Sequence, residues 1–211
     1  MFNTDTTIVA GPESEPLDGL IETILSQQSP IVPTQRMADA LRQAFPNWNQ
    51  ALLAGPDVIQ VVLAGARGNL TKAKAGYIHR VLGRLLAERG DLSLNFLRTY
   101  SAADARQWLL TLPGVGPKTA SCVLLFNLQL PAMPVDTHVL RIALRLRLVA
   151  ENTKPSDVET WFEQQLPQQW ESHYEFHLNA IVHGQTTCKA QHPKCADCVL
   201  NDCCPSSNLS G

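Results

Sequence analysis

Apolar residues recur every three or four positions through most of the chain, which is the spacing of one face of an α-helix. Alternating, turn-bounded strand patterns are missing, and no clear Asn-Gly or Asp-Gly hairpin appears. The helical patterns cover residues 18–28, 35–45, 58–65, 71–89, 102–112, 157–166 and 175–184. The sequence therefore predicts an all-α fold.

Capping residues and helix breakers predict where these helices begin and end. Ser, Thr and Asp favour helix N-termini, Gly favours C-termini, and Pro interrupts a helical pattern. The expected N-caps are Thr34, Asp57, Ser101 and Ser156, the last in a capping box with Glu159. The residues expected to end helices are Pro30, Pro33, Gly90 and Gly184.

The segment "LPGVGPKTA", residues 112–120, interrupts the helical pattern with a tight turn. Helical patterns lie on both sides, and Pro117 stands where a second helix would begin. Two helices joined by a Gly-x-Gly turn leave backbone N–H groups pointing outward, a geometry that binds phosphate without reading base sequence. Taken alone, Gly114 and Gly116 favour the plainer explanation of a helix corner that needs unusual backbone angles.

Lys118 is oddly placed for a residue at a helix start. The macrodipole is positive there, so the first turn ordinarily carries Asp or Glu. Asp136 precedes the amphipathic pattern "THVLRIALRLR", and we expect it to be the N-cap. A carboxylate held there can also act as a base, while dipole and burial would favour the uncharged, nucleophilic amine of Lys118. The amine and the carboxylate thus have a shared chemical task.

Composition and charge narrow the class of protein but name no partner. The chain has 211 residues, of which 45% are hydrophobic and 17% charged, with a net charge of −2, so it reads as soluble and globular without an overall basic signal for nucleic acid. Apolar runs such as "CVLLF" are too short to cross a bilayer, and the N-terminus lacks a secretory signal. We therefore expect a protein of the reducing cytoplasm with no membrane contact. Basic residues gather in two places, and each group taken alone is typical of a solvated helix face. The first group is Lys72, Lys74, Arg80 and Arg84, and the second is Arg141, Arg145 and Arg147.

Four cysteines near the C-terminus follow the pattern C-x6-C-x2-C-x5-C, at Cys188, Cys195, Cys198 and Cys204. Four thiolates at this spacing suit a tetrahedral metal or a cubane iron–sulfur cluster, and a disulfide framework does not fit a reducing compartment. Structural zinc sites usually pair two C-x2-C knuckles, and only one is present. Cys203 adds a fifth thiol, but ending the motif there would shorten the last interval to x4.

These features, in this order, resemble the endonuclease III family of DNA glycosylases within the helix-hairpin-helix superfamily. The resemblance rests on "LPGVGPKTA", "VDTHVLRIALRL", the cysteine loop and, more weakly, "ILSQQ" at residues 24–28, and it covers roughly residues 18–205. It implies two domains with a DNA groove between them. The first is a helical barrel over residues 18–132 with the hairpin at about 106–128; the second is a cluster domain of residues 1–17 and 133–211 with the iron–sulfur loop at 188–204.

The resemblance also implies the role of each motif. Lys118 would attack the sugar C1′ of a flipped nucleotide, Asp136 would activate it, and the resulting imine would allow β-elimination. The implied cofactor is a [4Fe-4S] cluster on the four cysteines, and the implied partner is duplex DNA with a damaged base or an abasic site, bound by a monomer. Gln28 would fill the gap left by the flipped base. The other implied DNA contacts are the hairpin residues Leu112, Gly114, Val115 and Gly116 and the loop lysines Lys189 and Lys194.

The choice of substrate follows from Lys118 and from the residues after Asp136. The adenine-excising branch of the superfamily generally lacks a lysine at the position of Lys118 and differs at Thr137 and His138, so we expect removal of oxidised pyrimidines with strand nicking. Two departures leave the lesion open, because Pro117 replaces an arginine common in relatives and Ser29-Pro30 replaces a Thr-Asp pair. The same core is similar to plant glycosylases that excise 5-methylcytosine, although those carry long additional domains.

Two other functions remain open from the sequence. One is a glycosylase without lyase action, in which water attacks under Asp136 and Lys118 only holds a phosphate. The other is an iron–sulfur protein that binds DNA or senses redox state without catalysis. The Lys118 and Asp136 pair argues against the second alternative, since binding alone needs neither residue.

Overall fold

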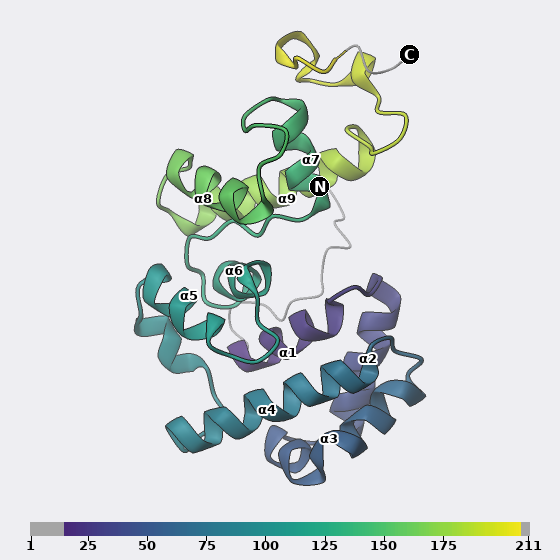
Figure 1. Cartoon of the computed structure of the whole chain (residues 1–211), viewed down its shortest axis with the longest axis vertical. Helices are drawn as coiled ribbons and strands as arrows, with labels where there is room; N and C mark the ends of the chain where they lie inside the picture. The colour runs from purple at the N-terminus through teal and green to yellow at the C-terminus, as the bar shows by residue number, and fades with distance from the viewer. Residues whose placement is uncertain (1–14, 208–211) are drawn as a thin grey trace. The chain divides into compact units, whose positions relative to one another are not determined.

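The computed structural model describes residues 15–207, and within this range the chain forms nine α-helices and three short 3-10 helices without a strand (Figure 1). The prediction of an all-α fold is confirmed. The α-helices are α1 (Pro16–Ser26), α2 (Ile31–Ala44), α3 (Trp48–Gly65), α4 (Thr71–Arg89), α5 (Ala102–Leu110), α6 (Pro117–Phe126), α7 (Thr137–Arg145), α8 (Pro155–Gln165) and α9 (Trp170–Thr186); the 3-10 helices are η1 (Asn95–Thr99), η2 (Cys195–Asp197) and η3 (Asn201–Cys203).

The described residues form two compact units that divide between Gln129 and Leu130. The N-terminal unit contains α1 to α6, and the C-terminal unit contains α7 to α9 and the cysteine loop. The domain boundary expected between residues 132 and 133 stays a prediction. Residues 15–17, expected with the cysteine loop, belong to the N-terminal unit, and residues 1–14 lie outside the described range.

Helix α1 is the most buried element of the N-terminal unit, since nine of its 11 residues are buried. It packs on α2, α4 and α6, while α3 lies along α4 and α5 lies beside α6. In the C-terminal unit α7 packs on α8 and α9 through its apolar face. The core there consists of Met133, Val135, Val139, Ile142, Ala143, Val158, Phe162 and Ala180.

Three of the sequence-based helix ends in the N-terminal unit are confirmed. Ser101 caps α5 by accepting a hydrogen bond from the Asp104 N–H at 3.1 Å. Gly90 ends α4 in the left-handed region with φ 71°, which glycine adopts without steric cost. Pro117 is the first residue of α6, where its fixed φ suits a helix and its missing N–H is not needed.

Helix α2 begins three residues before the expected cap at Thr34. Pro33 lies in its first turn, where a missing N–H costs nothing because that group has no partner within the helix. Thr34 is fully buried inside the helix, and its Oγ1 donates to the Pro30 carbonyl at 2.9 Å. The prediction of Pro33 as a stop and Thr34 as an N-cap was therefore wrong.

Helix α3 begins at Trp48, ten residues before the pattern that Asp57 was expected to cap. Asn47 caps it by accepting from the Gln50 N–H at 3.1 Å. The helix kinks at Gly55, whose φ of 85° departs from helical geometry, and it resumes at Pro56. Asp57 lies after this proline inside the helix, so its predicted cap was wrong.

The predicted capping box of Ser156 and Glu159 was also wrong. Helix α8 starts at Pro155, two residues before the expected start at residue 157, and no side chain caps its first turn. Proline at the first position is already fixed in helical φ, so the start moves to it. The Ser156 hydroxyl instead lies 3.3 Å from an Asp157 carboxylate oxygen.

Gly184 does not end α9, which continues to Thr186. The residue is buried, and a Cβ added there would lie 2.7 Å from Nδ1 of His138. The glycine therefore permits the close approach of α7 to α9. The stop predicted at this position was wrong because packing between helices, rather than helix termination, requires the missing side chain.

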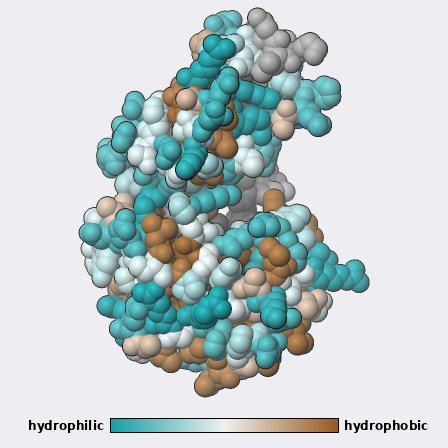
Figure 2. All heavy atoms as spheres, in the orientation of Figure 1, coloured by the Kyte–Doolittle hydropathy of each residue, from teal (hydrophilic) through white to brown (hydrophobic). Residues whose placement is uncertain are grey.

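No helix within residues 15–207 combines the length and the apolar character needed to span a membrane. On the face drawn in Figure 2, apolar side chains form small groups among hydrophilic ones.

Candidate functional site

The turn over residues 111–116 joins α5 to α6 as a hairpin between two helices. Leu112 and Val115 anchor it, with 2% and 8% of their surface exposed, and the Val115 N–H donates to the Leu112 carbonyl at 3.2 Å. Because these side chains are buried, Leu112 and Val115 can offer a ligand only backbone groups.

The fold requires glycine at one of the two glycine positions of the hairpin and not at the other. Gly114 has φ 81°, and a Cβ there would lie 2.4 Å from the Tyr77 ring, so the fold itself requires glycine. Gly116 has φ −99° and ψ 179°, an extended conformation open to any residue, and a Cβ would meet nothing within 4 Å. The fold leaves the missing side chain of Gly116 unexplained, whereas close approach of a ligand to its backbone would explain it.

The start of α6 is open to solvent and electrostatically positive. No side chain caps it, and its first turn contains no acidic residue. The Gly114 and Gly116 N–H groups have no hydrogen-bond partner within residues 15–207. Uncapped N–H groups and the macrodipole together favour an anion at this end.

Lys118 lies in this first turn and is exposed, and its side chain makes no hydrogen bond or ion pair to another residue of the described range. The chain therefore does not supply the burial that we expected around this amine. What it supplies is access, because the side chain is free to reach a bound molecule.

The end of α1 is joined to the hairpin. Gln27 donates through Nε2 to the Gly114 carbonyl at 2.9 Å and to the Thr119 hydroxyl at 3.1 Å. The next residue, Gln28, is exposed and adopts the left-handed conformation with φ 52°. Its carbonyl accepts from Nδ2 of Asn69 at 2.5 Å. The predicted gap-filling residue thus extends from a turn whose backbone is held on both sides.

Lys74 lies next to this turn, and its environment contradicts the prediction of a solvated helix face. Only 1% of the residue is exposed, and its Nζ donates to the Leu25 carbonyl, the Ser29 hydroxyl and the Asn69 amide oxygen. Burial lowers the pKa of Lys74 to about 8. A signal was present in the sequence, because Lys74 falls on the same apolar helix face as Ile78.

Asp136 caps α7 in the C-terminal unit, as predicted. Its Oδ1 accepts from the N–H groups of His138 and Val139, both at 2.8 Å. Its Oδ2 has no hydrogen-bond partner within residues 15–207, and the residue is half-buried. One oxygen therefore fixes the helix start while the other remains available to a ligand.

Two arginines one turn apart on α7 bind the loop that begins at Cys188. Arg141 donates through Nε to the Cys188 carbonyl and through Nη2 to the Gly184 carbonyl, both at 2.8 Å. Arg145 donates to the Cys188 sulfur at 3.3 Å and to the Lys189 carbonyl at 2.6 Å. The interpretation of these arginines as solvated was wrong, because they donate to backbone carbonyls and to a cysteine sulfur more than 40 residues away.

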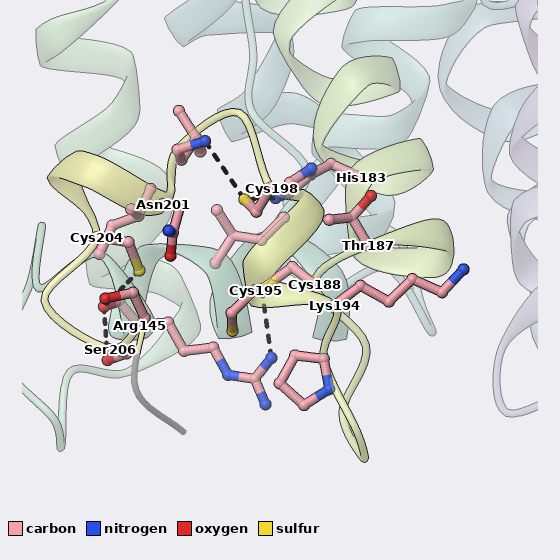
Figure 3. Close-up of a pocket in the computed structure, with 15 residues that line it drawn as sticks. Arg145, His183, Thr187, Cys188, Lys194, Cys195, Cys198, Asn201, Cys204 and Ser206 are labelled. Carbon is pink, nitrogen blue, oxygen red and sulfur yellow. Dashed lines mark hydrogen bonds between the residues drawn. The ribbon is translucent and has the colours of Figure 1, made fainter. Parts of the chain in front are cut away.

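Cys188, Cys195, Cys198 and Cys204 line one pocket, and Cys203 does not (Figure 3). The Leu200 N–H donates to the Cys198 sulfur at 3.4 Å, and Nε2 of His183 lies 3.7 Å from the same sulfur. Burial lowers the pKa of His183. Cys203 is exposed and points its thiol at the Leu200 carbonyl. The spacing that ended the motif at Cys204 selects the same four residues as the pocket.

The ligand groups that this pocket offers are four thiols around a cavity. Within residues 15–207 no three His, Cys, Asp or Glu side chains come close enough to hold one metal ion. A four-iron cubane takes one thiolate on each iron, so its four sulfurs border a cavity instead of meeting at a point. Donors from Arg145 and Leu200 to two of the sulfurs suit thiolate ligands. Lys189 and Lys194 are both exposed on this loop, and Figure 3 shows the Lys194 ammonium directed away from the sulfurs.

Comparison with known proteins assigns these features to a family. The model of the HhH-GPD superfamily base excision DNA repair protein matches residues 21–168, which include the hairpin and Asp136. Endonuclease III of Synechocystis sp. is 31% identical over 199 residues, covering 92% of this chain and 83% of that protein. The chain belongs to the endonuclease III family.

Two further relatives define how far the likeness extends. A protein of Arabidopsis thaliana, named as a candidate DNA glycosylase, is 34% identical over 200 residues, and this chain spans 64% of its length. A solved structure of endonuclease III trapped as a covalent intermediate with DNA has a TM-score of 0.76 and 26% identity, covering 93% of this chain and 86% of that one. The two-domain endonuclease III fold therefore accounts for nearly the whole chain.

Proposed function

We propose that this chain is a base excision repair DNA glycosylase with AP lyase activity that removes oxidised pyrimidines from duplex DNA. Membership of the endonuclease III family supports the reaction class. The observation that carries the proposal is the exposed amine of Lys118 at an uncapped, positive helix start. A lysine there can bond covalently to a sugar that the hairpin holds by its phosphates.

The hairpin would bind the DNA backbone. Gly114 and Gly116 offer N–H groups without partners in the described residues, and Gly116 leaves room for a phosphate. These contacts are blind to base identity, so they hold any duplex. Lys189 and Lys194 would add phosphate contacts from the cysteine loop.

In the proposed reaction the target nucleotide leaves the stack, and Asp136 accepts a proton from the Lys118 ammonium. The amine attacks C1′ of the sugar as the bond between C1′ and the base breaks, and the base leaves with that electron pair and takes a proton from water. The adduct nitrogen then loses a proton, and the bond between C1′ and the ring oxygen breaks as that oxygen takes a proton, which leaves an imine between C1′ and Lys118. Loss of a C2′ proton then expels the 3′ phosphate, which nicks the strand, and water releases the lysine.

We also propose that Cys188, Cys195, Cys198 and Cys204 hold a [4Fe-4S] cluster. We further propose that the protein acts on DNA in the reducing cytoplasm. When bound, the cluster would serve as a structural cross-link of the loop that carries Lys189 and Lys194. Support comes from the pocket that these four cysteines share and from the N–H donors to their sulfurs.

Iron and sulfide analysis of the two neighbouring cysteine variants tests the ligand set. Cys204→Ser should lose the brown chromophore and most of the iron, because serine is a poor ligand for this cluster. Cys203→Ser is the matched control and should keep four irons per chain, since its thiol lies outside the pocket. Stoichiometric zinc without sulfide in the unmodified protein would contradict the cluster.

A panel of duplexes with single lesions tests the function itself. The substrates are an oxidised pyrimidine, an adenine opposite oxidised guanine, 5-methylcytosine and a preformed abasic site, each scored separately for base release and for nicking. We expect coupled release and nicking on the oxidised pyrimidine and nicking at the abasic site. Release without nicking would identify a glycosylase in which water attacks, and binding without either product would identify a non-catalytic protein.

A further inference from the structure

Lys74 is a buried cation without an acidic partner. It lies on α4 with 1% of its surface exposed. Its Nζ donates to the Leu25 carbonyl at 2.7 Å, to the Ser29 Oγ at 2.6 Å and to the Asn69 Oδ1 at 3.0 Å. An ammonium has three N–H donors, so all of them are used by uncharged oxygens.

The three acceptors of Lys74 surround one short turn. The Leu25 carbonyl belongs to the last turn of α1, where carbonyls lack partners and the macrodipole favours a cation. Ser29 follows Gln28 directly, and Asn69 donates to the Gln28 carbonyl. Lys74 therefore contacts the backbone or side chains before, after and opposite Gln28.

The same turn is held from its other side by the hairpin. Gln27 donates to the Gly114 carbonyl and to the Thr119 hydroxyl. Gln28 between these two attachments has φ 52°, a conformation that a residue with a side chain rarely adopts without support. Its side chain is exposed while its backbone is fixed, as insertion into DNA would require.

We infer that Lys74 is a positioning residue whose ammonium holds the turn at residues 27–29, so that Gln28 can enter the gap left by the flipped base. The inference rests on the proposed function and adds a residue that never touches DNA. Burying an unpaired charge costs free energy, and a neutral side chain could close an ordinary turn. The three N–H donors of one ammonium would offset this cost by fixing the conformation of Gln28.

The protonation state of Lys74 offers a readout that a purely structural role would not move. Burial lowers its pKa to about 8, and the neutral amine has two N–H donors for three acceptors. The ionisable groups on the surrounding elements have other partners or solvent: Glu22 pairs with Arg42, Tyr77 lies under Arg80, and Arg67 and Lys72 are exposed. Insertion of Gln28 should therefore weaken as pH rises through about 8.

The experiment uses a duplex with a fluorescent purine opposite a reduced abasic site, which the protein can bind but cannot process. Emission rises when the purine loses its stacking neighbours, so it reports filling of the gap. We expect Lys74→Met to abolish most of this rise and to weaken binding by about tenfold, equivalent to ~1.4 kcal/mol. Lys72→Met, an exposed lysine on the same helix, is the matched control and should keep the emission rise.

A double variant tests whether Lys74 acts through Gln28. If it does, Lys74→Met combined with Gln28→Ala should bind no more than about twofold more weakly than Gln28→Ala alone. Losses that simply multiply would overturn the inference. Because Lys74→Met removes a buried group, thermal unfolding of each variant is measured beside binding, and Ser29→Ala provides a milder change of the same contact.

The pH arm uses the unmodified protein and is independent of any folding defect. The emission rise should decline between pH 7 and 9.5, while the unfolding temperature does not decline with it. An emission rise that is constant over this range would overturn the inference, as would one that falls together with stability. Failure of the proposed catalytic function would appear separately, in the lesion panel, because this duplex undergoes no reaction.

Discussion

Lys118 and Lys74 occupy the first turns of two helices in the same compact unit, but their surroundings are opposite. Lys118 on α6 is exposed and has no partner among the described residues, whereas Lys74 on α4 is buried and donates three hydrogen bonds. A nucleophile has to reach its substrate, so it cannot be enclosed by its own chain. A lysine enclosed by the chain can act only through the backbone that it holds. Lys118 is therefore the lysine that a substrate can reach, and Lys74 is the lysine that the fold desolvates.

The largest expected effect comes from removing the carboxylate that would serve Lys118. Asp136→Asn keeps an oxygen that can cap α7. The free energy of unfolding of this variant should therefore stay within about 0.5 kcal/mol of that of the unmodified protein. Base release should fall by about 10²- to 10⁴-fold, the usual contribution of general acid–base catalysis. Single-turnover release from an oxidised-pyrimidine duplex measures it. A rate unchanged by this variant would show that Lys118 is activated without Asp136.

Lys74 should give the protein an unusual dependence of stability on pH. Its pKa is lowered from 10.5 to about 8 on folding, so between these values the unfolded chain binds the extra proton. Stability should therefore rise with pH through about 8, and the burial cost should be fully present below it. Denaturant unfolding at pH 7.5 and 9.5 should show a gain of up to about 2 kcal/mol that Lys74→Met lacks. Parallel behaviour of the two proteins would mean that Lys74 is not desolvated.

The hairpin glycines should separate folding from binding with smaller effects. Gly114→Ala should destabilise by roughly 1–3 kcal/mol, because it has positive φ and meets the Tyr77 ring. Gly116→Ala should leave stability within about 0.5 kcal/mol, because its backbone is extended and its surroundings are open. Its binding to damaged and undamaged duplex should weaken by similar factors, measured by fluorescence anisotropy. A loss confined to one lesion would contradict a phosphate contact.

Local sequence signals predicted the parts of the site that depend on neighbouring residues. Pro117 begins α6 and Asp136 caps α7, because both effects act within one turn of the residue itself. The cysteine spacing selected the four residues that line the pocket. These features need only the chain within a few positions to be recognised.

The two lysine environments were expected the other way round, because burial depends on residues far away in the sequence. The acceptors of Lys74 come from positions 25, 29 and 69, and a backbone carbonyl has no signature in the sequence. Arg145 was misread for the same reason, since its partners are at Cys188 and Lys189. At Pro33 the error was different, because a proline in the first turn of a helix looks like a proline that ends one.

Covalent trapping with borohydride tests most directly whether Lys118 is the nucleophile. Reduction of an imine joins the protein permanently to a duplex that carries an oxidised pyrimidine, and the product is resolved by denaturing electrophoresis. We expect the unmodified protein and Lys72→Gln, a change at an exposed lysine on α4, to be trapped. Lys118→Gln should lose trapping and nicking while still binding the lesion, because Lys118 is the lysine at the open start of α6. Trapping of Lys118→Gln at the yield of the unmodified protein would show that another amine attacks the sugar and would reduce Lys118 to a phosphate contact.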